Sequence, residues 1–316
     1  MSSKFHVDWK PSSTAQSSNE EQSLFPSRNF EIEKKNLLIK EVLNGVKDPK
    51  DQIQYRMVMN ELAIYQDVQY HPNLLEFKGF VINDKNPPSI VFKYSGEENL
   101  LKVLRRRRSL GTVEREENGF VLVDRIENSN NQESIDRKDT DLCSDLTRYA
   151  LDIAEGMEYL ASLSYVHRDV ALRNMYITSD GTVRIGDLGL ARKNERTTCY
   201  TIRTKEMPLS HHWMAPETFE HKKFTKESDV WSYGVCLHEI FTLGDVPYKG
   251  VEDMLKYLNR GRRLAKPDYC NEEIYEFMKK CWDANPKDRP TFADCVSFFK
   301  EQVKKQENGK DEARQE

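Results

Sequence analysis

The stretch YVHRDVALRNMYI, residues 165–177, decides the fold. Apolar residues stand at both of its ends, and five ionisable or amide side chains fall within the eight positions between them. These five are His167, Arg168, Asp169, Arg173 and Asn174. Because a packing element rarely carries so many polar groups, the pattern predicts a polar loop held between a helix end and a short strand.

The chemistry of these side chains fits phosphoryl transfer. An aspartate can orient a hydroxyl group and accept its proton, and an asparagine five residues later can share a divalent metal. The loop resembles the H-R-D-L-x-x-x-N catalytic loop of protein kinases. Its segment Ala171-Leu172-Arg173 is similar to the A-A-R variant of tyrosine kinases, because serine/threonine kinases usually carry a lysine at the position of Ala171.

Two further motifs follow in the order that kinases show. Asp187-Leu188-Gly189 stands in the place of D-F-G, and Ala215-Pro216-Glu217 stands in the place of A-P-E. A polar loop that only caps a helix is the alternative for the first motif alone, and the ordered set argues against it. The segment around the third motif resembles the W-M-A-P-E of tyrosine kinases, which implies a tyrosine acceptor. Between Pro208 and Trp213 the chain is two residues longer than the corresponding tyrosine-kinase segment.

The C-terminal part carries structural signatures of the same family. Ser228–Val235 resembles the buried kinase helix whose aspartate, here Asp229, holds the backbone of the catalytic loop. The closing C-W-x-x-x-P-x-x-R-P-x-F signature begins at Cys281. The resemblance implies that Arg289 pairs with Glu217.

The resemblance implies a bilobal α+β protein kinase fold, with a small antiparallel-sheet N-lobe that contains helix αC and a large, mainly helical C-lobe. It also implies ATP and Mg²⁺ as cofactors. Asp169 would position the acceptor hydroxyl and accept its proton, and Arg173 would assist at the transferred phosphate or the acceptor. Asn174 and Asp187 would hold the metal.

The N-terminal part supplies the expected nucleotide contacts. Leu37–Val42 is an apolar run with one lysine, Lys40, and resembles the V-A-I-K strand. Residues 51–68 show helical spacing and place Glu61 before HPNLL at 71–75. The resemblance implies that Glu61 pairs with Lys40, which holds the phosphates; a solvated glutamate is the alternative. Two further strands are predicted after the helix, and the second leads into the kinase hinge. The residues implied around adenine are Leu38, Phe92, Lys93, Tyr94, Ser95 and Tyr176.

One expected element is missing. Kinases place a G-x-G-x-x-G loop before the lysine, but the first glycine here is Gly45, after Lys40. Only seven residues separate Ile32 from Lys40, too few for two strands and a hairpin. Either the protein dispenses with the loop or the sequence lacks a segment that its relatives have.

Two functions therefore stay open. The missing loop favours a catalytically weak or inactive pseudokinase that acts as a binding or scaffold module. So does the extra bulk of Leu38 and Tyr176, where the family carries alanine and leucine, because overpacking a site costs about 1–3 kcal/mol. The charged groups that the template requires are all retained, which favours an active tyrosine kinase in signal transduction.

The expected organisation is a disordered segment at 1–24, the N-lobe and hinge at 25–104, a kinase insert at 105–141, the C-lobe at 142–301 and a charged, frayed tail at 302–316. The start of the N-lobe resembles a juxtamembrane segment, and the insert is typical of split-kinase receptors. The run Arg105–Arg108 is interpreted as a solvated helix end, with a nuclear or phospholipid signal as the alternative. Leu190–His212 is the expected activation loop. A phosphate on Tyr200, its only tyrosine, could pair with basic residues such as Arg168 or Arg192.

Bulk properties limit the remaining classes. The chain has 316 residues, is 38% hydrophobic and carries a net charge of −4, which argues against nucleic acid as a partner. No apolar run reaches the length of a transmembrane segment, and the polar start lacks a signal-peptide core. The six cysteines form no C-x-x-C pair and are expected to be reduced.

We therefore expect a cytoplasmic protein, or one at the cytoplasmic face of the plasma membrane through partners or a longer receptor form. Its expected partners are protein substrates with tyrosine acceptors and a second copy of the chain, in a transient homodimer for trans-phosphorylation.

Overall fold

The structure is a computed structural model that describes residues 37–40, 49–83, 86–110, 112–116, 119–123, 132–193 and 210–313. Side chains are described for residues 55–80, 89–109, 141–193 and 210–309. The chain divides into two compact units. The first unit comprises Met1–Tyr70 and Leu75–Ser95, and the second comprises His71–Leu74 and Gly96–Glu316.

The first unit contains a three-stranded antiparallel sheet of order β1-β3-β2. Its elements are β1 Leu37–Lys40, helix α1 Pro49–Asp67, β2 Phe77–Asn83 and β3 Asn86–Lys93. Strand β1 pairs Lys40 with Ile90 and Leu38 with Phe92. Helix α1 packs on β3, where the ring of Tyr65 meets Phe92 edge to face at 5.0 Å between centroids. The predicted strand, helix and strand pair are confirmed.

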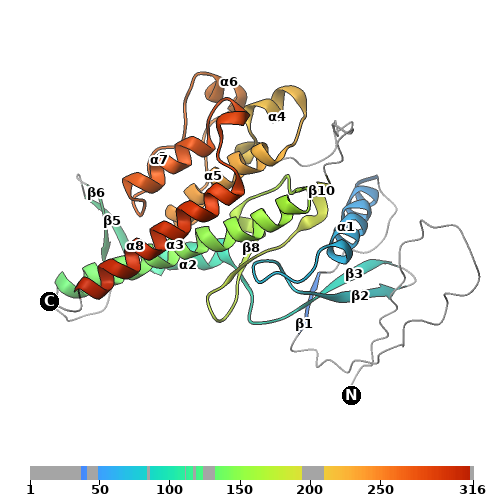
Figure 1. The fold of residues 1–316 in the computed structure, drawn as a ribbon, viewed down its shortest axis with the longest axis horizontal. Helices are drawn as coiled ribbons and strands as arrows, with labels where there is room; N and C mark the ends of the chain where they lie inside the picture. The colour runs from blue at the N-terminus through green and yellow to red at the C-terminus, as the bar shows by residue number, and fades with distance from the viewer. Residues whose placement is uncertain are drawn as a thin grey trace, which may run out of the picture. The chain divides into compact units, whose positions relative to one another are not determined.

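Long helices form the core of the second unit. They are α3 Gln132–Ser162, α5 Lys226–Phe241, α7 Glu272–Cys281 and α8 Phe292–Ala313. Helix α8 lies along α3, and α5 packs against both α3 and α7 (Figure 1). Helix α5 is buried from Ser228 to Phe241, because its sequence is mostly apolar on every side. The small strand-rich unit and the larger helical unit confirm the expected α+β kinase fold.

Short strands hold the polar loop at 167–174. Strand β7 Tyr165–Val166 precedes the loop and pairs with β10 Arg192–Lys193. Strand β8 Met175–Ile177 follows it and pairs with β9 Val183–Ile185 and with β4 Glu98–Asn99. Helix α3 ends three residues before β7, so the predicted position between a helix end and a strand is confirmed.

The predicted insert and tail contain more regular structure than the sequence indicated. Helix α2 Leu100–Leu110 continues past Arg105, a hairpin forms from β5 Thr112–Glu116 and β6 Gly119–Val123, and α3 begins at Gln132. Helix α8 continues through the expected tail to Ala313. Two glutamines anchor the first part of this continuation: Gln302 is buried and donates to Glu273 of α7 at 2.6 Å, and Gln306 donates to Thr147 of α3 at 2.9 Å.

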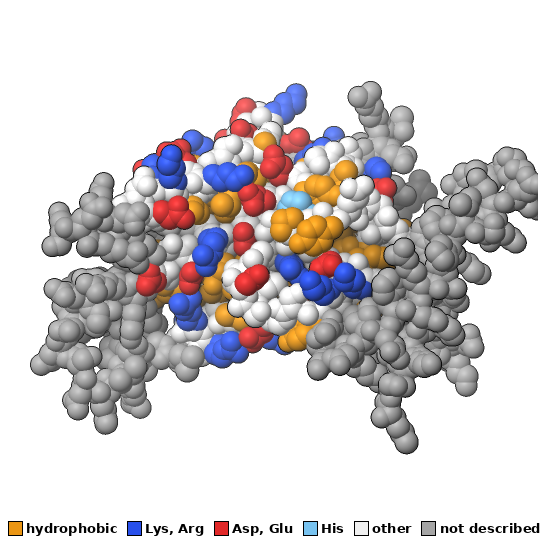
Figure 2. All heavy atoms as spheres, turned by 60° about the horizontal axis from the view of Figure 1, so that its bottom comes forward, with side chains coloured by type: hydrophobic (Ala, Val, Ile, Leu, Met, Phe, Trp, Pro, Cys, Tyr) orange, Lys and Arg blue, Asp and Glu red, His pale blue; other side chains and the backbone are white. Residues whose placement is uncertain are grey.

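The four arginines of the basic run near the end of α2 each contact a nearby group. Arg105 Nε donates to the Gly244 carbonyl at 2.8 Å. Each of the next three arginines pairs with a carboxylate, and the three pairs are Arg106–Glu98, Arg107–Asp145 and Arg108–Asp245. Cations also suit the negative end of a helix dipole. These contacts support the interpretation as a solvated helix end. On the face shown in Figure 2, basic and acidic side chains are likewise interspersed.

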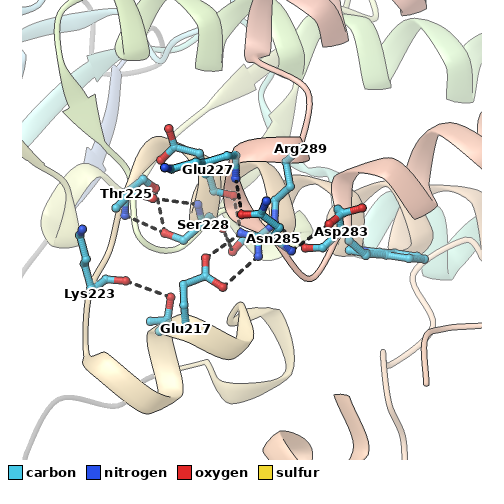
Figure 3. Close-up of polar contacts among 12 residues, drawn as sticks. Glu217, Lys223, Thr225, Glu227, Ser228, Asp283, Asn285 and Arg289 are labelled. Carbon is cyan, nitrogen blue, oxygen red and sulfur yellow. Dashed lines mark hydrogen bonds and ion pairs between the residues drawn. The ribbon is translucent and has the colours of Figure 1, made fainter. Parts of the chain in front are cut away.

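The predicted pair of Arg289 and Glu217 is confirmed, and it ties three segments of the second unit together. Glu217 lies in helix α4 Pro216–His221 and accepts two hydrogen bonds from Arg289, at 2.7 and 2.9 Å. Arg289 also donates to the carbonyls of Glu227 and Asp283 (Figure 3). The guanidinium side chain is fully buried. Breaking such a pair from one side leaves an uncompensated charge.

None of the helices within the described ranges combines the length and the apolar character needed to cross a bilayer.

Candidate active site

A buried aspartate of α5 fixes the start of the polar loop. The backbone N–H groups of His167 and Arg168 donate to Asp229 Oδ2 and Oδ1, at 2.6 and 2.9 Å. This is the role that the sequence predicted for Asp229. Burial raises the pKa of Asp229 to about 7, and the two N–H donors oppose that rise. Arg168 has a φ of 70°, a left-handed conformation that is uncommon without glycine, and the Asp229 contact holds it there.

A second buried carboxylate of α5 fixes the end of the loop. Glu239 Oε2 accepts hydrogen bonds from the Leu172 backbone N–H at 3.0 Å and from Trp213 Nε1 at 2.7 Å. Burial raises the pKa of Glu239 to about 7, while these donors and the charge of Arg173 lower it. Glu239 therefore connects the polar loop to the segment that precedes α4. Sequence reasoning missed it, although an acidic residue in the apolar stretch VCLHEIF was an available signal.

The three residues predicted to be catalytic lie together. Asn174 Nδ2 donates to Asp169 Oδ2 and to the Asp169 carbonyl, both at 2.8 Å. Arg173 Nη2 forms an ion pair with Asp169 Oδ1. Both oxygens of the Asp169 carboxylate are therefore held by neighbours on its own loop. The 3₁₀ turn η2 Leu172–Asn174 brings these neighbours back to Asp169.

The guanidinium of Arg173 has contacts beyond Asp169. Its central carbon lies 4.5 Å from the centroid of the Trp213 ring, a cation–π contact. Its Nη2 also donates to Ser210 Oγ at 2.6 Å. The Arg173 carbonyl accepts from Asn99 Nδ2 at 2.6 Å. Ser210 and the Trp213–Glu239 contact were not found from the sequence, because they join segments far apart in the chain.

Asp187, the second predicted metal ligand, directly follows a segment bonded to the polar loop. The Gly186 N–H donates to the Asn174 carbonyl at 2.9 Å, so Asn174 and Asp187 lie on neighbouring segments. Asp187 itself has a left-handed backbone with a φ of 56°. Carboxylate and amide oxygens are the hard ligands that Mg²⁺ prefers. Because Asn174 donates through Nδ2, its side-chain oxygen Oδ1 is the atom that suits a cation. The oxygen atoms of Asn174 and Asp187 therefore fit the expected Mg²⁺.

His167 is a structural member of the loop. It is completely buried, and burial lowers its pKa although Asp169 and Asp187 act in the opposite direction. The imidazole of His167 is therefore part of the packed interior. Its Nδ1 accepts the backbone N–H of Asp169 at 3.3 Å. Leu188, which replaces the usual phenylalanine, is also fully buried.

The nucleotide residues predicted in the first unit are described in part. Phe92 and Glu61 are each only 1% exposed. The Lys93 N–H donates to the Glu76 carbonyl at 2.8 Å, whereas Tyr94 is exposed and Ser95 is half-buried. Lys40 and Leu38 lie in β1, but their side chains are outside the described set, so the pairing of Lys40 with Glu61 stays a prediction.

The remaining predicted residues belong to the second unit. Tyr176 is half-buried in β8 and faces Asn99 and Arg184 across the sheet. Arg168 places its guanidinium 5.4 Å from the centroid of the Phe224 ring. Tyr200 lies outside the described residues.

A pocket opens beside Asp169, and every residue that lines it belongs to the second unit. Its lining includes the polar side chains of Asp169 and Ser210 and the apolar side chains of Trp213, Met214 and Phe224. The lining therefore combines a carboxylate with apolar side chains.

An unpredicted ion pair holds the strand that leads to Asp187. Arg184 in β9 pairs with Glu97 at 2.8 Å. The Glu97 side chain is completely buried and that of Arg184 is 10% exposed, so each charge depends on the other.

Comparison with known proteins agrees with this geometry. Residues 28–299 match the family described as protein tyrosine and serine/threonine kinase. The chain is 36% identical to the tyrosine-protein kinase receptor old-1 of Caenorhabditis elegans, over 89% of this chain and 55% of the receptor. It is 38% identical to the receptor-like tyrosine-protein kinase kin-15 of the same organism, over 81% of this chain and 55% of that protein.

The similarity extends to vertebrate receptors. Fibroblast growth factor receptor 1 of Pleurodeles waltl is 36% identical, over 84% of this chain and 30% of the receptor. The chain thus spans about half the length of the two nematode relatives and less of the amphibian one. Because the family match covers most of the sequence and includes the polar loop, the chain belongs to the protein tyrosine and serine/threonine kinase family.

Proposed function

We propose that this chain is an active protein tyrosine kinase that transfers the γ-phosphoryl group of ATP to tyrosine hydroxyls of protein substrates in signal transduction. The observation that carries the proposal is the arrangement of Asp169 with Arg173 and Asn174 beside a partly apolar pocket. The names of the relatives, which are tyrosine kinase receptors, support the same activity.

Asp169 is the proposed catalytic base. The acceptor phenol approaches Asp169 and donates a hydrogen bond to its carboxylate, which orients the oxygen and takes its proton as the new bond to phosphorus forms and the bond from the γ-phosphorus to the bridging oxygen of ADP breaks. Arg173 holds the Asp169 carboxylate on one side and presents its remaining N–H groups to the acceptor or to the transferred phosphate. Asn174 fixes the other carboxylate oxygen. A general base of this kind contributes about 10²–10⁴-fold in rate.

ATP and Mg²⁺ are the proposed cofactors, and the bound ion would neutralise charge on the phosphates. Asn174 and Asp187 are the proposed ligands of the ion, because their oxygen atoms are of the kind it prefers. Lys40, oriented by Glu61, is the proposed phosphate contact of the first unit. The backbone of Lys93, Tyr94 and Ser95 is proposed to bind adenine.

The adenine surroundings and the regulation belong to the same proposal. Leu38, Phe92 and Tyr176 would surround the base. Phosphorylation of Tyr200, in trans within a transient homodimer, would place a phosphate within reach of basic residues such as Arg168. We propose that the chain acts in the cytoplasm or at the cytoplasmic face of the plasma membrane.

The pseudokinase alternative rests on the missing Gly-rich loop. It is the weaker proposal, because the loop that carries Asp169, Arg173 and Asn174 keeps its charged groups and their mutual contacts. A scaffold module has no need of this arrangement.

The test is a phosphotransfer assay with matched peptides that differ only in carrying tyrosine, serine or threonine as the acceptor. We expect transfer to the tyrosine peptide and a loss of about 10²-fold or more in Asp169→Asn. Asp268→Asn is the control, because Asp268 is exposed and lies outside the loop. Transfer only to serine or threonine would contradict the acceptor assignment, and equal rates in wild type and Asp169→Asn would contradict the role of Asp169.

A further inference from the structure

Ser210 is bonded to the machinery of the polar loop, although it lies 37 residues from Arg173 in sequence. It precedes the 3₁₀ turn η4 His211–Trp213, in the part of the chain that is two residues longer than the tyrosine-kinase pattern. Its Oγ accepts a hydrogen bond from Arg173 Nη2 at 2.6 Å. The same nitrogen donates to Asp169 Oδ1.

These two contacts determine how the Arg173 guanidinium is turned. Each terminal guanidinium nitrogen carries two hydrogens, so Asp169 and Ser210 together take both hydrogens of Nη2. The Trp213 ring covers one face of the guanidinium, 4.5 Å from its central carbon. A stacked ring restricts tilting but allows the plane to rotate in place. Two acceptors on one nitrogen remove that freedom.

Ser210 also lies beside the proposed catalytic base. It lines the same pocket as Asp169 and is half-buried. Trp213, three residues later, donates a hydrogen bond from Nε1 to Glu239. The segment from Ser210 to Trp213 therefore contacts Arg173 at two points, one polar and one aromatic.

We propose that Ser210 is a positioning residue for phosphoryl transfer to tyrosine. It fixes the plane of the Arg173 guanidinium, so that Asp169 stays held on one side and the donors on Nε and Nη1 are presented to the phenol oxygen. This inference rests on the proposed kinase activity. The longer segment before Trp213 then provides a hydroxyl group, that of Ser210, to the catalytic loop.

The kinetic test compares Ser210→Ala and Ser210→Thr with wild type on a tyrosine peptide. Ser210→Ala removes a hydrogen bond to a charged group that is partly exposed, so it should lower kcat/KM by about 3- to 30-fold. Ser210→Thr keeps a hydroxyl on Cβ and should restore most of the loss. The KM for ATP should not change, because Ser210 contacts none of the described residues that are proposed to hold the nucleotide. Ser297→Ala, which removes an exposed hydroxyl of α8, is the control.

A second measurement follows the contact itself without turnover. In ¹⁵N-labelled protein, the side-chain signals of Arg173 are identified by their loss in Arg173→Lys. Wild type should show slow rotation about the bond from the central carbon to Nη2, and Ser210→Ala should show fast rotation with an unchanged melting temperature.

The results separate this inference from the proposed activity. If wild type transfers phosphate and Ser210→Ala matches it in kcat/KM, the inference is overturned and the activity stands. If wild type transfers no phosphate, the proposed activity fails, and the rotation of Arg173 then decides whether Ser210 positions it. Identical rotation in wild type and Ser210→Ala would overturn the inference in either case.

Discussion

Two buried carboxylates of α5 accept hydrogen bonds in different ways, and this difference predicts different changes in stability when each is replaced by its amide. Asp229 uses both oxygens, one for each backbone N–H of His167 and Arg168. Glu239 uses one oxygen, Oε2, for both the Leu172 N–H and Trp213 Nε1. An amide side chain offers one oxygen and replaces the other with a donor. Glu239→Gln can therefore keep both hydrogen bonds, whereas Asp229→Asn must lose one.

The expected magnitudes follow from these contacts. Asp229→Asn leaves one buried backbone N–H facing a second donor, which costs about 1–3 kcal/mol of unfolding free energy. Glu239→Gln exchanges a charged acceptor for a neutral one, which weakens two hydrogen bonds, but it also removes the cost of burying a charge. These effects oppose each other, so we expect the stability of Glu239→Gln to stay within about 1 kcal/mol of wild type at pH 8.

The pH dependence of the free energy of unfolding provides a second test of the same prediction. Burial raises the pKa of Glu239 from 4.5 to about 7, so the folded chain keeps a proton that the unfolded chain releases between these values. The contribution of this group to the free energy of unfolding therefore falls as the pH rises from about 4.5 to 7, by at most about 1.4 kcal/mol per pH unit. Above pH 7 the contribution is constant. Glu239→Gln removes this slope, and Asp229, whose pKa is also about 7, keeps its own.

The assay is urea unfolding of wild type, Glu239→Gln and Asp229→Asn at pH 5, 6, 7 and 8. Relative to wild type, Glu239→Gln should gain stability from pH 5 to 7. Equal destabilisation of the two variants at pH 8, or an unchanged slope in Glu239→Gln, would refute the reasoning from the shared oxygen.

Three further predictions concern stability in the second unit. Arg289→Ala should lower the free energy of unfolding, measured in urea, by about 3–5 kcal/mol, because Glu217 loses both hydrogen bonds from the Arg289 guanidinium. An effect under about 1 kcal/mol would contradict this reasoning from a buried ion pair. Glu97→Ala should cost a similar amount, about 3–5 kcal/mol, because it leaves Arg184 buried without its partner; a matched loss in the double variant with Arg184→Met, instead of recovery, would count against this. Gly244→Ala should cost about 1–3 kcal/mol in thermal unfolding, because its φ is 82° and a Cβ would meet Arg105 Cγ at 2.9 Å, whereas Gly309→Ala in α8 meets no atom within 4 Å and should leave stability level or higher.

Local patterns were sufficient for the parts of the site that lie close together in sequence. The spacing of Asp169, Arg173 and Asn174 places all three on one loop, and the helix before it and the strand after it follow from apolar spacing. The role of Asp229 and the pair of Arg289 with Glu217 also came from motif resemblance, and both are present in the structure.

Contacts between segments that lie far apart in the sequence were not predictable in this way. The contacts from Glu239 through Trp213 to Arg173 and Ser210 join residues that are 26 to 40 positions apart along the chain. Each of these residues has an ordinary local context, so only the packed arrangement reveals the connection. The hairpin of β5 and β6 was missed for a different reason. Its strands lie in a charge-rich stretch whose composition is typical of a loop.

Autophosphorylation tests the central claim most directly. The purified chain is incubated with Mg²⁺-ATP beside Asp169→Asn, and phosphorylated residues are located by mass spectrometry. The account predicts phosphotyrosine in wild type only, with Tyr200 among the modified positions, and thermal stabilisation of both proteins by Mg²⁺-ATP. No phosphate incorporation into wild type, together with no thermal shift, would contradict the account and leave a pseudokinase.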